Sequence, residues 1–153
     1  MPRHKVFVSY SHTDKSFRDE LVPVWRAVPT IEEVLWFDEP DIDIGDEFHP
    51  QIQQALAASS IGILLLSNHF FTSNYITRHE LPYLLQHARE RALKIAPLYV
   101  TPIPDDVFKV TLEVDGQRDR FDLKAILGAH SLNEPLNTLD RGQRDKIYAG
   151  LAN

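Results

Sequence analysis

The most constraining feature of the chain is the run Ile61–Ser67 (IGILLLS), in which apolar residues follow one another without polar alternation. A strand that keeps one face in water alternates apolar with polar side chains, so an unbroken run is typical of a strand covered on both faces. Strands of that kind occur in parallel sheets with helices on either side. The run therefore predicts a central strand of an α/β domain.

Three further strands are predicted from β-branched and aromatic residues. Lys5–Ser11 (KVFVSYS) and Lys94–Val100 (KIAPLYV) are the clearest, and Val34–Phe37 is a shorter candidate. Between Val34–Phe37 and the central strand, the segment Asp38–Gly45 (DEPDIDIG) is so rich in Asp, Pro and Gly that it predicts a loop.

Apolar residues at helical spacing lie between the predicted strands. One helix is expected from Lys15 to Pro29, with Pro23 as a candidate site for a kink. Two more helices are predicted by the stripes Phe48, Ile52, Ala55, Leu56, Ser59 and Leu81, Leu84, Leu85, Ala88, the second running to about Ala92. The segment Asn68–Arg78 between them is polar and aromatic without a period, so it is expected to be irregular.

Strands that alternate with helices imply right-handed crossovers and a parallel sheet. We therefore expect a flavodoxin-like three-layer α/β sandwich, with a central, mostly parallel sheet flanked by helices. Ligands of such sheets gather at the carboxyl ends of the strands. Further along, Val110–Val114 and Arg118–Leu123 flank the turn dipeptide Asp115-Gly116, which predicts a hairpin, and Asp140–Leu151 predicts a closing helix.

The composition excludes several classes of function. The 153 residues fit a single domain over 1–153, whether alone or cut from a longer multidomain protein. With no cysteine there is no disulfide, thiolate zinc site or thiol nucleophile, and a cytoplasmic location is expected. A net charge of -6 argues against direct binding of nucleic acid, and the apolar runs are too short to span a membrane.

Metal and serine-hydrolase sites are also poorly supported by the sequence. His79-Glu80 continues as Leu81-Pro82-Tyr83, so the HExxH zinc motif fails, and no G-x-S-x-G elbow is present. The acidic residues of Asp38–Asp46 suit a solvated loop as well as a cation site. We favour the solvated loop, so no metal is expected.

Three stretches carry a resemblance to a known family through their order and spacing. They are Val6–His12 (VFVSYSH) with Asp14; Trp36–Asp38 (WFD) followed by Asp43-Ile44-Gly45-Asp46; and Ile61–Ser67 continuing through Ser73-Asn74-Tyr75 to His79-Glu80-Leu81. Together they resemble the TIR (Toll/interleukin-1 receptor and resistance protein) domain, particularly its prokaryotic members.

The resemblance implies that Glu80 is the catalytic residue of an NAD⁺ glycohydrolase. In such domains a glutamate faces the nicotinamide ribose, where a carboxylate can stabilise an oxocarbenium-like transition state. NAD⁺ is the substrate, and no cofactor is required. The family commonly has a tryptophan four residues before the glutamate, where this chain has Ile76. The predicted substrate-binding residues are Tyr10, Ser11, His12, Asp38, Tyr75 and Ile76.

The resemblance further implies that activity depends on self-assembly. The loop Asp38–Gly45, with Asp43, Ile44 and Gly45 as assembly residues, would pack against a neighbouring copy. The expected partners are other TIR domains, in a homo-oligomer or filament, and a fused or associated sensor domain. The expected setting is prokaryotic immune defence or signalling, with ADP-ribose or a cyclic ADP-ribose as the product.

Two alternatives stay open at this point. Thr77-Arg78-His79-Glu80 has the spacing of a helix capping box, although Pro82 would then fall beyond the first turn, at a cost of about 3 kcal/mol. The domain could also be a non-catalytic adaptor that binds other TIR domains, with Glu80 serving structure alone. A receiver domain shares the fold, but Ser11-His12 replaces the acidic pair expected after its first strand.

Overall fold

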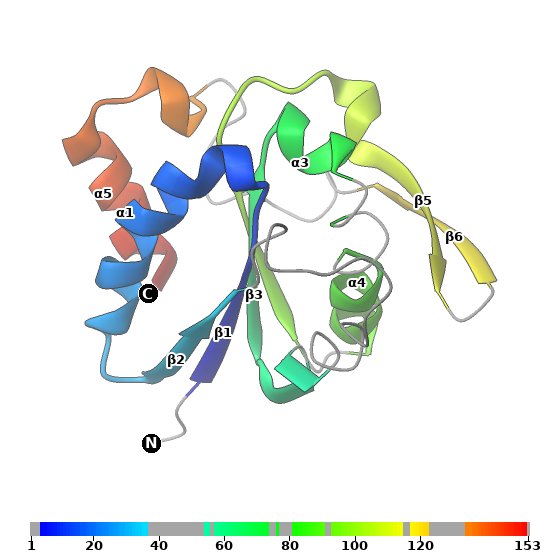
Figure 1. Ribbon diagram of the computed structural model, residues 1–153, viewed down its shortest axis with the longest axis horizontal. Coiled ribbons are helices and arrows are strands. Elements are labelled where there is room, and N and C mark those ends of the chain that lie inside the picture. The colour runs from blue at the N-terminus through cyan, green and yellow to red at the C-terminus, as the bar shows by residue number, and fades with distance from the viewer. Residues whose placement is uncertain are drawn as a thin grey trace.

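The computed structural model describes residues 4–36, 54–55, 57–73, 76, 81–90, 93–114, 117–122 and 134–152. Its centre is a parallel sheet of four strands, in the order β2-β1-β3-β4. The strands are β1 (His4–Ser9), β2 (Ile31–Leu35), β3 (Ile61–Leu66) and β4 (Lys94–Tyr99). Helices cover both faces of this sheet, so the predicted flavodoxin-like α/β architecture is confirmed (Figure 1).

The central position predicted for the apolar run is also confirmed. β3 lies between β1 and β4, and all its residues after Ile61 are buried. A Cβ atom added at Gly62 would lie 2.9 Å from Leu84 Cδ2 and 3.1 Å from Leu93 Cδ2. The glycine therefore allows the side chains of the α4 region to approach the sheet closely.

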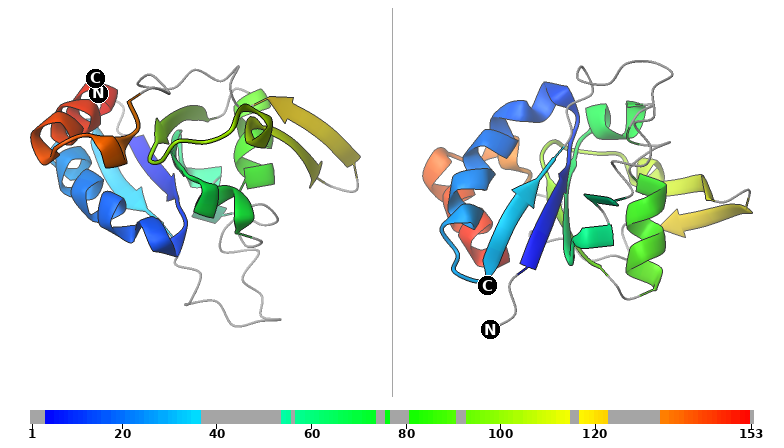
Figure 2. Two further views of the ribbon diagram at one scale, coloured as in Figure 1. Left: turned by 90° about the horizontal axis from the view of Figure 1, so that it is seen from above. Right: turned by 60° about the horizontal axis from the view of Figure 1, so that its bottom comes forward.

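One face of the sheet is covered by α1 (Lys15–Arg26) and α5 (Arg141–Ala152), and the other by α3 (Asn68–Thr72) and α4 (Leu81–Arg89) (Figures 1 and 2). The predicted helices from Lys15 and over Asp140–Leu151 are thus confirmed. Each face has its own apolar cluster, because side chains alternate across a strand: Val6 and Val8 point to the α1 side, and Phe7 to the α4 side.

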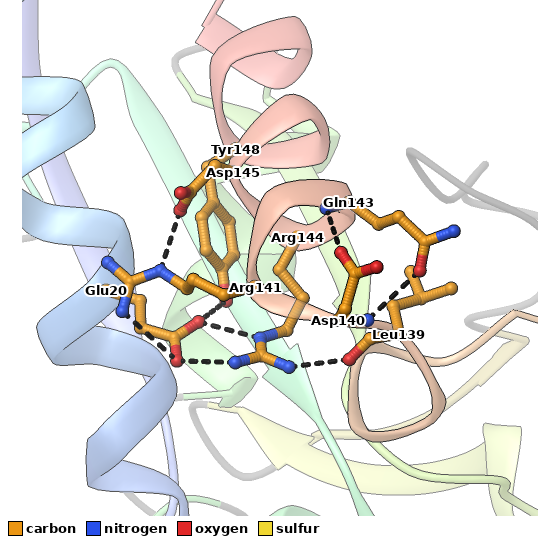
Figure 3. Close-up of polar contacts among 8 residues, drawn as sticks. All are labelled: Glu20, Leu139, Asp140, Arg141, Gln143, Arg144, Asp145 and Tyr148. Atoms are coloured by element: carbon orange, nitrogen blue, oxygen red, sulfur yellow. Dashed lines mark hydrogen bonds and ion pairs between the residues drawn. The ribbon is translucent and has the colours of Figure 1, made fainter.

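Polar contacts join α5 to α1 across the first face (Figure 3). Arg144 donates from Nε and Nη2 to the two carboxylate oxygens of Glu20, at 2.9 and 3.0 Å, and the Tyr148 hydroxyl donates to Glu20 Oε1 at 2.8 Å. Trp25 Nε1 donates to the Tyr148 carbonyl at 3.1 Å. These contacts fix how the two helices lie against each other.

The start of α5 is closed by a reciprocal pair of hydrogen bonds. Gln143 N donates to Asp140 Oδ1 at 2.8 Å, and Asp140 N donates to Gln143 Oε1 at 3.0 Å. This is the geometry of a capping box, which satisfies amides that an isolated helix end would leave unpaired.

Several predicted boundaries were wrong. β1 ends at Ser9 instead of Ser11, because the Ser11 hydroxyl caps the short helix η1 (His12–Asp14) by accepting from Thr13 N at 3.4 Å. β2 begins three residues before Val34, since an edge strand keeps Ile31 buried while Glu32 and Glu33 stay exposed.

Two more corrections concern the region after β3. Asn68–Thr72, expected to be irregular, forms α3, because Ser67 Oγ accepts from Phe70 N at 3.1 Å and so starts a helical turn. α4 ends at Arg89, before the expected Ala92. Most of the helix expected over Phe48–Ser59 lies outside the described residues, although 54–55 and 57–58 are helical.

The predicted hairpin is confirmed. β5 (Lys109–Val114) pairs antiparallel with β6 (Gln117–Asp122), and the pair projects beyond the main sheet on the α4 side (Figures 1 and 2). Two further short helices, η4 (Asp105–Phe108) and η6 (Leu136–Thr138), flank this region in sequence. Among the described helices, none has the length and apolar character to cross a bilayer.

Candidate functional site at the carboxyl ends of β1 and β3

The strand order places a topological switch point at the carboxyl ends of β1 and β3. From β1 the chain passes to β2 on one side, and it later returns to β3 on the other side of β1. The connections after β1 and β3 therefore leave in opposite directions, and ligands of open parallel sheets bind at such a switch point. We call residues 10–14 and 67–69, which follow β1 and β3, the switch-point edge.

A buried hydrogen bond joins the two halves of this edge. Ser67 Oγ donates to Asp14 Oδ2 at 2.5 Å, and both residues are buried. Burial raises the pKa of the Asp14 carboxyl above its ordinary value, against the opposing effects of the Ser67 hydrogen bond and the charge of His69. Because Ser67 also caps α3, one serine links the end of β3, the start of α3 and the turn after β1.

Exposed polar side chains lie next to Asp14 and Ser67 in the sequence. His12 stands on the β1 half of the edge, and Asn68 and His69 stand on the β3 half. Asn68 Nδ2 donates to the Pro102 carbonyl at 3.3 Å, which ties the β3 half to the segment after β4. Imidazole and amide groups are suited to hydrogen-bond the hydroxyls and phosphates of a nucleotide.

The predicted substrate-binding residues fall into different environments. Ser11 is 6% exposed and caps η1, whereas His12 is exposed. Tyr10 is 2% exposed, and its hydroxyl accepts a hydrogen bond from Arg18 Nη1. Ile76 is fully buried, with its amide donating to Ser73 Oγ at 3.2 Å. Ser11 and His12 thus lie together at the edge, Tyr10 and Ile76 pack in the core, and the substrate contacts of all four stay predictions.

The remaining predicted site residues lie outside the described part of the chain. They are the catalytic candidate Glu80, the substrate-binding candidates Asp38 and Tyr75, and the assembly residues Asp43, Ile44 and Gly45. Their roles stay predictions.

The residues on either side of the Glu80 segment are nevertheless well anchored. Ile76 and Leu81 are fully buried and belong to the same apolar cluster on the α3–α4 face. Both residues are therefore core positions, and residues 77–80 between them lie outside the described part of the chain. Pro82 is the second residue of α4 as described. It therefore lies in the first turn of the helix, which tolerates proline.

Sequence reasoning missed part of the switch-point edge. The sequence patterns do not predict that Asp14, Ser67, Asn68 and His69 belong to it. The signal was available, because Ser67-Asn68-His69 directly follows the predicted central strand, at whose carboxyl end ligands are expected. In the portion of the chain that the structure covers, no group of three or more metal-ligating side chains gathers.

Comparison with known proteins places these features in a family. The family model described as a TIR domain matches residues 6–129, which includes both halves of the switch-point edge and position 80. An NAD(+) hydrolase, PdTIR, of Paracoccus denitrificans is 30% identical over 107 residues, 69% of this chain and 34% of that protein.

Two further curated relatives match with similar identity. A 2′ cyclic ADP-D-ribose synthase, AbTIR, of Acinetobacter baumannii is 26% identical over 69% of this chain and 38% of that protein. An NAD(+) hydrolase, TcpC, of Escherichia coli is 29% identical over 54% of this chain and 26% of that protein. The matched part thus spans between 26% and 38% of the length of these relatives. From its fold and the family match over most of its length, the chain belongs to the TIR domain family.

Proposed function

We propose that this TIR domain cleaves the bond between nicotinamide and ribose in NAD⁺, with Glu80 as the catalytic residue. The observation that carries the proposal is the match to TIR proteins named as an NAD(+) hydrolase and a cyclic ADP-ribose synthase, within a family match that includes position 80.

The chemistry requires stabilisation of positive charge on the ribose. The pyridinium of NAD⁺ is already cationic, so nicotinamide leaves as a neutral molecule and its bonding electrons go with it. The ribose carbon is left electron-deficient, and a carboxylate beside the ring stabilises that charge in the transition state. Attack by water then gives ADP-ribose and releases a proton, whereas attack by a hydroxyl or nitrogen of the same molecule gives a cyclic product.

The switch-point edge supplies groups to hold the dinucleotide. In this proposal His12, Asn68 and His69 hydrogen-bond the ribose and phosphate oxygens, and the buried Asp14–Ser67 link keeps the two halves of the edge at a fixed separation. No metal and no cofactor take part. Asp43, Ile44 and Gly45 would contact a neighbouring TIR domain, and the active form would be a homo-oligomer or filament. A sensor domain would bring the copies together. The setting would be prokaryotic immune defence in the cytoplasm.

The direct test is release of nicotinamide from NAD⁺ by the purified chain at increasing protein concentration. We expect release per molecule to rise with concentration, and Glu80→Gln to lower the rate about 10²–10³-fold, as for other preorganised electrostatic groups. Glu90→Gln is the matched control, because Glu90 is an exposed glutamate just after α4, and it should stay within about twofold of wild type.

Two results would contradict the proposal. Release that persists in Glu80→Gln would remove Glu80 from the catalytic role. An absence of release from the wild-type chain, even when copies are forced together by fusion to an oligomerising partner, would favour the non-catalytic adaptor.

A further inference from the structure

Arg18 is a charged residue of α1 that the fold buries. It is only 6% exposed. Removing a guanidinium from water is costly unless hydrogen bonds and favourable charge contacts replace its hydration. Arg18 Nε and Nη2 both donate to Asp19 Oδ1, at 3.2 and 2.7 Å, and Nη1 donates to the Tyr10 hydroxyl.

Two aromatic rings also contact this guanidinium. Arg18 Cζ lies 5.1 Å from the centroid of the Tyr10 ring and 4.7 Å from that of the Trp36 ring. Such contacts are favourable for a planar delocalised cation, and a lysine ammonium does not reproduce their geometry. The buried charge is thus stabilised by two rings as well as by hydrogen bonds.

The two rings come from the ends of neighbouring strands. Tyr10 directly follows β1 and Trp36 directly follows β2, and these strands pair in parallel with Phe7 beside Leu35. Arg18 therefore bridges the carboxyl ends of two adjacent strands from a helix that lies over them. A contact of this kind limits both ring positions and, through them, the main chain that follows.

On the β1 side, that main chain is the switch-point edge. Tyr10 is followed immediately by Ser11, which caps η1, and by the exposed His12. Side chains that bind substrate need supporting residues whose own positions are fixed. We propose that Arg18 is a positioning residue for the NAD⁺ site, holding the β1 half of the switch-point edge through Tyr10 and Trp36. The inference rests on the function proposed above.

The test is the Arg18→Lys variant, which keeps the positive charge but loses the planar fork. We expect KM for NAD⁺ to rise about tenfold, with kcat within about twofold of wild type, because displaced binding groups weaken ground-state and transition-state binding alike. A residue that served stability alone would instead lower the folded fraction, which reduces kcat per total protein and leaves KM unchanged. An unchanged KM overturns the proposal.

Arg26→Lys is the matched control. Arg26 lies on the same helix with its Cζ 5.4 Å from the centroid of the Trp36 ring, but its side chain is exposed. This variant tests the loss of one arginine–tryptophan contact by itself, and KM should change less than twofold. A rise in KM equal to that of Arg18→Lys would assign the effect to Trp36 alone and overturn the role given to Tyr10.

A second variant and a second readout keep the test independent of folding and of catalysis. If Arg18→Lys does not fold, Arg18→Met replaces it, because the Asp19 side chain is 56% exposed and water can solvate its carboxylate once the guanidinium is removed. The backbone amide resonances of Ser11 and His12 should move in the Arg18 variant and stay in place in Arg26→Lys. If wild type releases no nicotinamide, the proposed function fails. The amide resonances of Ser11 and His12 then decide by themselves whether Arg18 positions the switch-point edge. Resonances that stay in place would overturn the role proposed for Arg18.

Discussion

The helices on the two faces of the sheet differ in the contacts that supplement their apolar clusters. On the α1–α5 face, Glu20 of α1 binds Arg144 and Tyr148 of α5 through three hydrogen bonds, all between residues more than 120 positions apart in sequence (Figure 3). Arg18, on the same helix as Glu20, is buried between two rings.

The α3–α4 face relies on apolar and aromatic packing. Phe70 meets Phe71 edge to face with centroids 5.2 Å apart, and Phe108 meets both Phe71 and Tyr99 at 5.8 Å. Contacts of this kind do not depend on ionisation, whereas those of Glu20 do. Acid pH should therefore weaken the contacts of Glu20 and leave the aromatic packing around Phe70, Phe71 and Phe108 unchanged.

The largest expected effect comes from the apolar face. Phe70→Ala removes a fully buried ring and should lower the free energy of unfolding by about 3–5 kcal/mol, by the same amount at pH 5 and pH 8. Chemical denaturation at the two pH values measures it, with Phe71→Ala, at a half-buried position, as a control of smaller effect. A decrease in the free energy of unfolding that differs clearly between the two pH values would mean that packing on this face depends on ionisation.

The next effect comes from the polar face. Glu20→Ala leaves the fully buried Tyr148 without its carboxylate acceptor and should cost about 1–3 kcal/mol at pH 7. Asp145→Ala is the control, because its ion pair with Arg141 at 2.9 Å is exposed and should contribute less than about 0.5 kcal/mol. Equal losses in the two variants would mean that the Glu20 contacts have no special weight.

The pH dependence of Glu20 follows from its pKa. Burial raises the pKa of this carboxyl, but the hydrogen bonds from Arg144 and Tyr148 and the charges of Arg144 and Arg141 outweigh burial and place the pKa below its ordinary value of 4.5. The stabilisation is therefore fully present above pH 4.5 and is lost as pH falls through the folded-state pKa. The difference between wild type and Glu20→Ala should shrink in that acid range.

The smallest effect is expected at the switch-point edge. Asp14→Asn keeps an acceptor for Ser67 and should change the free energy of unfolding by less than about 1 kcal/mol at pH 7. Because burial raises the pKa of Asp14, its contribution is fully present below pH 3.8 and is lost as pH rises through the folded-state value. As pH rises above 3.8, the free energy of unfolding of Asp14→Asn should therefore increase relative to that of wild type, which is the opposite sign to Glu20. A relative decrease with rising pH would contradict this interpretation of Asp14.

Much of the fold could be predicted because it depends on local patterns. The apolar run at Ile61–Ser67 marked the central strand, and the helical spacing from Lys15 marked α1. The start of β2 was predicted at Val34 instead of Ile31, because an edge strand tolerates the exposed residues Glu32 and Glu33, and these interrupt the apolar run. α3 was missed because a single serine cap, Ser67, starts a helix of only five residues.

The site was less predictable because it is built from contacts between distant parts of the chain. Ser11 and His12 could be proposed, since they follow a strand whose carboxyl end is a ligand-binding position. The Asp14–Ser67 hydrogen bond joins residues 53 positions apart, and the local sequence around either residue does not predict that the two meet. The Arg18 contacts were not predicted either, because a charged residue on a surface helix is expected to face water.

Titration of an uncleavable carbocyclic analogue of NAD⁺ into the isotope-labelled chain, followed by backbone amide resonances, tests whether NAD⁺ occupies the carboxyl ends of β1 and β3. We expect the largest shifts on His12, Asn68 and His69, on both halves of the switch-point edge. Shifts confined to the β5–β6 hairpin, or none at saturating analogue, would contradict this expectation.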